Sequence, residues 1–217
     1  MAKGHRDSMS RDLLHQLCAG IAPWAALSLL LLGRNPYLSR LRITVSLLLA
    51  FFLLRIPVVG WNGFAWVRVL EPNPSFTLSA LLGIALWERI SGKKTFRPED
   101  WKVAWIFGAV VALLLYPMGL GLTSHDPYGW GWSPRIPILN AVAAVILLLW
   151  GNRFGIVLLL PFVGFLLHLQ ESTNFWDALI DPFYAIFSIL SVIATTALLG
   201  VKSVALTSQT YKAHRVL

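Results

Sequence analysis

The stretch IPILNAVAAVILLLWGNRFGIVLLLPFVGFLLHLQ, residues 136–170, decides the fold class of this chain. It holds two long apolar runs, 136–150 and 154–170, which are separated only by a short turn containing Gly151 and Gly155. Neither run alternates polar with apolar residues, as a half-buried strand would, so both are predicted to be helices. A tight glycine-containing connection between two such runs is typical of a helical hairpin that returns to the side from which it started.

Apolar runs of the same kind recur along the whole chain. Together they cover residues 17–32, 43–60, 76–91, 102–121, 136–150, 154–170 and 182–201. A membrane-crossing helix needs about 20 mostly apolar residues, so these runs predict an all-α fold, a polytopic transmembrane helical bundle. The first run is short and carries Pro23, and the predicted number of spans is therefore six to seven. The loops are too short to form a separate soluble domain.

Composition supports the same class. Of the 217 residues, 57% are hydrophobic and 13% are charged, and the mean hydropathy is +0.67. A soluble domain is about 45–50% apolar and about 25% charged, so a soluble globular fold and disorder are both excluded, and the single Cys18 excludes a disulfide scaffold. The chain divides into a basic N-terminal segment (1–16), a transmembrane domain (17–201) and a basic cytoplasmic tail (202–217).

The placement of the charged residues predicts the orientation of the chain. Loops 33–42 and 88–102 and the tail are rich in Lys and Arg, whereas loops 61–75, 122–135 and 171–181 hold five of the ten acids. Because basic loops stay in the cytoplasm, the C-terminus is predicted to be cytoplasmic and the acidic loops extracytoplasmic. One conflict remains, since seven spans would place the basic N-terminal segment outside.

The net charge of +8 lies mainly in the loops beside the membrane. The predicted partners are therefore membrane lipids with anionic headgroups, and no nucleic acid. One cysteine and the absence of a usable N-glycosylation acceptor fit a bacterial cytoplasmic (inner) membrane.

Ten tryptophans lie mostly near the ends of the predicted spans, as in an aromatic belt at the boundary between water and lipid. Three of them, Trp130, Trp132 and Trp176, lie instead in polar loops beside acids. Tryptophan beside carboxylates also suits contact with sugars or cationic groups, so these three are candidate residues for binding a substrate or a partner.

The predicted outer loops bring together a set of ionisable side chains. These are Arg68, Glu71, His125, Asp126, Glu171, Asp177 and Asp181. Such a set could bind a cation, or one acid could act as a general base, and the candidate catalytic residues are His125, Asp126 and Asp177. The alternative is that these groups are ordinary solvated loop charges.

Asp177 and Asp181 are four residues apart, so both carboxylates share one face if that stretch is helical. Asp181 also directly precedes Pro182 and an apolar run, which favours a helix N-cap followed by Pro at the first helical position. Asp177 has no corresponding structural role in the sequence.

Arg55 lies inside the predicted span 43–60. A charged residue there either extends to the interface along its own long stem or pairs with a buried acid, for which Glu71 and Asp181 are the candidates. No metal site and no cofactor are predicted, because the chain carries none of the motifs for phosphate, dinucleotide or zinc binding.

The sequence favours a non-catalytic membrane subunit. It would anchor a protein partner, or handle a lipid- or glycan-linked substrate, at the extracytoplasmic face. One alternative is a membrane-embedded enzyme acting on a lipid headgroup or glycan, with His125, Asp177 and Arg55 or Arg68 at its site. The other alternative is a small transporter, although no acid lies deep within a predicted span, as proton coupling would require.

Overall fold

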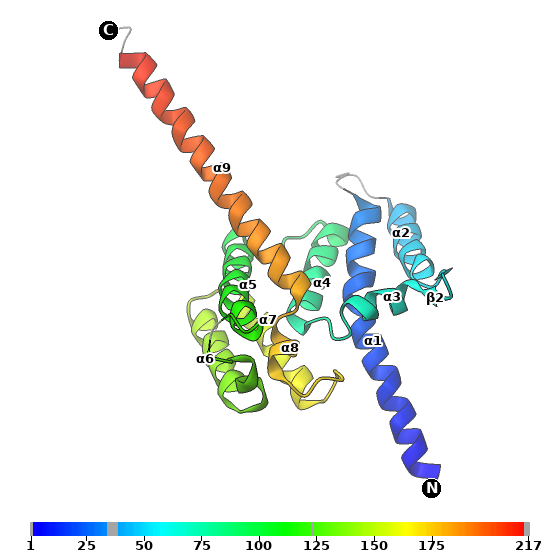
Figure 1. The fold of residues 1–217 in the computed structure, drawn as a ribbon. Coiled ribbons are helices and arrows are strands. Elements are labelled where there is room, and N and C mark those ends of the chain that lie inside the picture. The colour runs from blue at the N-terminus through cyan, green and yellow to red at the C-terminus, as the bar shows by residue number, and fades with distance from the viewer. Residues whose placement is uncertain (1, 34–38, 123, 215–217) are drawn as a thin grey trace.

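The computed structural model describes residues 2–33, 39–122 and 124–214. Within these ranges the chain forms nine α-helices, one 3₁₀ helix and one ribbon of two very short strands, which confirms the all-α prediction (Figure 1). The elements are α1 (Ala2–Leu32), α2 (Arg40–Leu53), β1 (Pro57–Val58), β2 (Trp61–Asn62), α3 (Gly63–Leu70), α4 (Phe76–Ser91), α5 (Pro98–Gly119), η1 (Tyr128–Trp132), α6 (Arg135–Leu149), α7 (Phe154–Leu166), α8 (Phe175–Leu179) and α9 (Pro182–His214).

Helices α4 to α9 share the main hydrophobic core. Its fully buried members include Leu81, Phe154, Phe175 and Tyr184. The most extensive helix–helix contacts join α5 to α9 and α6 to α7. The buried Tyr184 hydroxyl donates a hydrogen bond to the Ala104 carbonyl at 2.6 Å, which ties α9 to α5.

The predicted hairpin is present as α6 and α7. Gly151 ends the first helix with a φ of 69°, a left-handed conformation that favours glycine. At Gly155 a β-carbon would lie only 2.6 Å from the Ala144 carbonyl oxygen, so glycine is needed for the close approach of the two helices. Asn140 adds a hydrogen bond of 2.7 Å to the Leu158 carbonyl.

The run 43–60 is not one helix, and that part of the sequence prediction is wrong. Helix α2 ends at Leu53, and the chain then turns through the β1–β2 ribbon. Pro57 disfavours helix at the residue before it, and Val59 and Gly60 both have positive φ, as a tight hairpin turn requires. At 14 residues, α2 is about 21 Å long, which is shorter than a membrane core of about 30 Å.

Two helices of the described part of the chain are long and apolar enough to cross a membrane: Leu14–Leu32 within α1 and Pro98–Gly119. Only 17% and 28% of their most apolar windows are buried inside the protein, whereas the core helix of a soluble protein is mostly buried. Shorter apolar helices, α6 and α7 among them, also expose large side chains such as Leu149 and Leu160. These features indicate association with a membrane.

The loops gather at two ends of the molecule. The acidic end comprises residues 61–75, 124–134 and 168–181, and the basic end comprises residues 89–97 and 150–153. The N-terminus of α1 and the C-terminus of α9 point in opposite directions, with the C-terminus on the side of the basic end (Figure 1).

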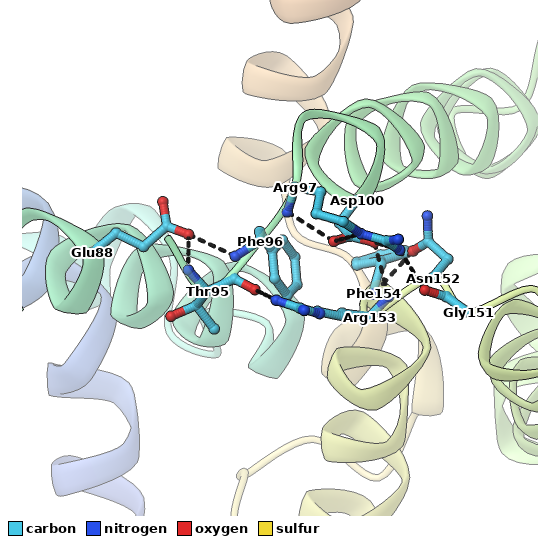
Figure 2. Close-up of polar contacts among 9 residues, drawn as sticks. All are labelled: Glu88, Thr95, Phe96, Arg97, Asp100, Gly151, Asn152, Arg153 and Phe154. Atoms are coloured by element: carbon cyan, nitrogen blue, oxygen red, sulfur yellow. Dashed lines mark hydrogen bonds and ion pairs between the residues drawn. The ribbon is translucent and has the colours of Figure 1, made fainter. Parts of the chain in front are cut away.

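A closed polar network holds the basic end together (Figure 2). Its centre is Asp100, which is completely buried and accepts hydrogen bonds from the backbone N–H groups of Arg97 at 2.8 Å and Arg153 at 2.9 Å. The Arg97 guanidinium also contacts Asp100 at 3.2 Å and donates to the Gly151 carbonyl, and Arg153 donates to the Thr95 carbonyl. The network therefore joins the start of α5 to the turn of the α6–α7 hairpin.

Glu88 completes this end from α4. Its Oε1 accepts hydrogen bonds from the backbone N–H groups of Thr95 at 2.7 Å and Phe96 at 2.6 Å (Figure 2). The charged groups here form hydrogen bonds with one another and with backbone N–H and C=O groups, so this network is structural.

Candidate functional site

A pocket of about 400 Å³ opens at the acidic end. Its charged lining is four carboxylates, those of Glu71, Asp126, Asp177 and Asp181, and among the described residues that line it none is basic. The other lining residues are Asn73, Leu115, Tyr116, Gly119, Leu120, Tyr128, Ile180 and Pro182. Four of the seven ionisable residues that the sequence grouped together thus surround one cavity.

Asp181 is the buried acid of the pocket, with 1% of its surface exposed. Its Oδ1 accepts a hydrogen bond of 2.8 Å from the backbone N–H of Tyr184 in the first turn of α9, which confirms the predicted N-cap. Its Oδ2 accepts one of 2.7 Å from the backbone N–H of Ser75, and Ser75 is itself the N-cap of α4. One carboxylate therefore joins the starts of two helices.

Asp177 lies on the short helix α8, which ends at Leu179. Ile180 is extended, so the stretch is not one helix and Asp177 and Asp181 do not share a helix face, as they would in a continuous helix, although both acids line the pocket. The Asp177 carboxylate accepts hydrogen bonds from the Tyr128 hydroxyl at 2.9 and 3.1 Å and from the Ser172 hydroxyl at 2.5 Å. Asp177 therefore has a structural role that the sequence did not show.

Asp126 and Glu71 make only local hydrogen bonds. Asp126 is exposed, and its Oδ1 accepts from the backbone N–H of Tyr128 at 2.9 Å, as in a turn that begins with Asp. Glu71 follows the end of α3, and its Oε1 accepts from the backbone N–H of Asn73 at 3.0 Å. Their remaining carboxylate oxygens are available to a ligand in the pocket.

The electrostatics of the pocket reflect burial and crowding of like charge. Burial raises the pKa of Glu71 above its ordinary value, and the charges of Asp181 and Asp177 raise it further. Burial likewise raises the pKa of Asp181. Burial and the neighbouring Asp177 raise the pKa of the Tyr128 hydroxyl to about 12. A bound cation or hydrogen-bond donor would relieve this repulsion.

One wall of the pocket depends on a close contact between η1 and the segment before α8. The Asn174 side chain donates a hydrogen bond of 3.1 Å to the Tyr128 carbonyl, and Trp176 donates one of 2.9 Å to the Pro127 carbonyl. Gly131 is buried against Asn174, and a β-carbon there would lie 1.7 Å from the Asn174 Oδ1. Only glycine fits at this position.

Several predicted site residues lie outside the pocket lining. Trp130 and Trp132 are exposed on η1, and Trp176 is half-buried in the wall described above. His125 is exposed, with its Nδ1 at 3.4 Å from the Ser124 Oγ, and it is not among the lining residues of the pocket.

The two predicted arginines lie elsewhere on the acidic end. Arg68 forms an ion pair of 2.5 Å with Glu171. The Arg55 guanidinium lies over the rings of Phe51 and Phe64, 5.0 and 5.4 Å from their centroids. It pairs with neither Glu71 nor Asp181, so the proposed buried ion pair is wrong.

The donor set limits the chemistry of the pocket. No group of three or more His, Cys, Asp or Glu side chains within the described ranges could hold a metal ion. Spread around a cavity with an apolar side formed by Leu115 and Ile180, the carboxylates can instead accept hydrogen bonds from hydroxyl or amine groups.

The sequence missed Tyr116 and Tyr128 as lining residues. Tyr128 lies in the segment HDPYGWGW, two residues after Asp126, and this proximity was the available signal.

Compared with known proteins, the chain matches no protein-family model, no curated protein and no solved structure.

Proposed function

We propose that the protein is a polytopic integral membrane protein in the inner membrane of a bacterium. The exposed apolar side chains of α6 and α7 and the two span-length helices support this proposal. The separation of charge between the two ends supports an orientation with the basic end in the cytoplasm and the acidic end outside.

At the acidic end the protein acts as a non-catalytic subunit that handles a lipid- or glycan-linked substrate. The observation that carries this proposal is the pocket of about 400 Å³, in which four carboxylates face an apolar side. Such a pocket suits a head group rich in hydroxyl or amine donors, with an apolar portion beside it. A protein partner that carries the chemistry would act on the substrate held there.

A binding role fits the hydrogen bonds of the acids better than a catalytic one. Asp177 is held by two hydroxyl groups and Asp181 by two backbone N–H groups, so both serve the fold. A general base needs a free oxygen within reach of the proton that it removes. The two acids with local contacts only, Glu71 and Asp126, are suited to hold a ligand.

The orientation is tested by labelling single cysteines in a Cys18→Ser background. Ser124→Cys at the acidic end should react with a membrane-impermeant maleimide in intact cells. Lys93→Cys at the basic end should react only after permeabilisation. The reverse pattern, or equal labelling of both variants in intact cells, would overturn the proposed orientation.

Ligand binding is tested by purifying the protein from native membranes in mild detergent and identifying the co-purifying lipids, glycans and proteins by mass spectrometry. The double variant Glu71→Gln/Asp126→Asn should lose the co-purifying species. Glu99→Gln, an exposed acid at the other end of the molecule, is the matched control and should retain them. The proposal fails if the double variant carries the same species as the wild type, or if the wild type carries none.

A further inference from the structure

A second cavity of the acidic end has the opposite charge. It is a cleft of about 390 Å³ between α1, α2 and α3. Its charged lining consists of Arg55 and Arg68, and among the described residues that form the cleft none is acidic. Its apolar lining includes Leu17, Ile21 and Trp24 from α1.

Arg55 is oriented but not paired. Its guanidinium lies over Phe51 and Phe64, and within the described ranges it makes no hydrogen bond or ion pair. A guanidinium carries five N–H donors in a fixed plane, a geometry that suits a phosphate group. The two aromatic rings therefore hold an available anion-binding group at the rim of the cleft.

Arg68 faces the same cleft from α3. Its Nη2 binds Glu171, but its Nε is buried and has no hydrogen-bond partner within the structure described. A buried donor without a partner is costly, and a ligand oxygen in the cleft would satisfy it.

Aromatic residues near the cleft are of the kind found at the depth of lipid headgroups. Trp61 and Trp66, whose ring centroids are 5.6 Å apart, are sequence neighbours of the lining residues Asn62 and Ala65, and tryptophan is typical of a membrane boundary. His15 of α1 contacts the His168 carbonyl of the acidic end at 2.9 Å, so the apolar wall from Leu17 to Trp24 runs from that end toward the middle of α1. Charge at the rim and an apolar wall below it match the two parts of a phospholipid.

We propose that this cleft binds an anionic phospholipid of the membrane, with its phosphate between Arg55 and Arg68 and an acyl chain along α1. The inference uses only the membrane location from the proposed function and does not depend on the acidic pocket.

The test uses the full chain, purified in detergent and freed of lipid. The probes are phosphatidylglycerol, phosphatidylcholine with the same acyl chains, and inorganic phosphate. Retained lipid is measured by native mass spectrometry and affinity by the shift of the thermal unfolding midpoint. We expect phosphatidylglycerol to bind, and R55Q to weaken that binding at least about tenfold. R135Q removes an exposed arginine of the same end outside the cleft and should leave binding unchanged.

Three outcomes would overturn the proposal. Equal binding by R55Q and the wild type would show that Arg55 does not take part in binding the lipid. Equal binding of phosphatidylcholine would show that the cleft recognises acyl chains without the charge. Binding of inorganic phosphate as tight as that of phosphatidylglycerol would identify a free-anion site. None of these results depends on Glu71 or Asp126, so failure here is distinguishable from failure of the acidic pocket.

Discussion

The two ends of the molecule each bury an aspartate, and the two aspartates differ in what surrounds them. Asp100 at the basic end and Asp181 at the acidic end are 0% and 1% exposed. Each accepts a backbone N–H at the start of a long helix, Asp100 from Arg97, the N-cap of α5, and Asp181 from Tyr184 in the first turn of α9. Asp100 is also paired with the Arg97 guanidinium. Asp181 has no basic neighbour in the lining of its pocket and shares that pocket with three other acids.

The same local structure therefore serves two purposes. At the basic end, Asp100 at the start of α5 is paired with Arg97, and the polar groups form hydrogen bonds with one another. At the acidic end the helix start borders an open cavity in which four carboxylates lie together with no basic group among the described lining residues. Proteins tolerate such repulsion where a ligand relieves it, and this difference supports the proposal that the acidic end binds a ligand while the basic end is structural.

The strongest test of this difference is Asp100→Ala. The change leaves two backbone N–H groups and the half-exposed Arg97 guanidinium without their acceptor, and we expect a loss of about 2–4 kcal/mol of stability, because each unsatisfied N–H costs about 1–3 kcal/mol. The measurement is the unfolding midpoint of the detergent-purified protein, with Glu99→Ala, an exposed neighbour, as the control. A loss below about 1 kcal/mol would contradict the structural role of the network around Asp100, because ordinary surface substitutions have effects of that size.

A smaller effect is expected from Gly131→Ala. Its β-carbon would collide with Asn174 and Trp176 in the pocket wall, so we expect a loss of about 1–3 kcal/mol together with weaker retention of the co-purifying species. Gly129→Ala is the matched control, because its β-carbon would meet only Asp126 Oδ2 at an ordinary 3.5 Å. Equal behaviour of the two variants would show that the wall yields and that the close contact is not required.

The sequence predicted those parts of the molecule that depend on local signals. The apolar runs predicted the helices, the turn at 151–155 predicted the α6–α7 hairpin, and the Asp181–Pro182 pair predicted a helix start. The break after α2 was missed although Pro57 and Gly60 were visible, because an apolar stretch has the same mean hydropathy whether it is helical or turns.

The site was predictable only in part. Loop sidedness brought Glu71, Asp126, Asp177 and Asp181 to one end, but it could not separate the acids of the pocket from Arg68 and Glu171. That separation depends on how α3 and the loop before α8 pack. Such contacts join residues about 100 positions apart, as between Arg68 and Glu171, and no periodicity in the sequence reports them.

The smallest effect that tests the difference between the acidic and basic ends is the pH dependence of stability in Glu71→Gln. The fold raises the pKa of Glu71 above its ordinary value of 4.5, so the folded state holds its proton more tightly than the unfolded state does. Stability of the wild type therefore falls as the pH rises from 4.5 through the raised value. Glutamine keeps the acceptor for the Asn73 N–H and cannot ionise.

The variant and the wild type should consequently have equal unfolding midpoints below pH 4.5, and the variant should be more stable at neutral pH. Part of the decline should persist in the variant, because the pKa of Asp181 is raised in the same direction. A constant difference at every pH would mean that Glu71 acts by packing alone. A wild type that gains stability over the variant as the pH rises would mean that its charge is already compensated, and the contrast with the closed network around Asp100 would then disappear.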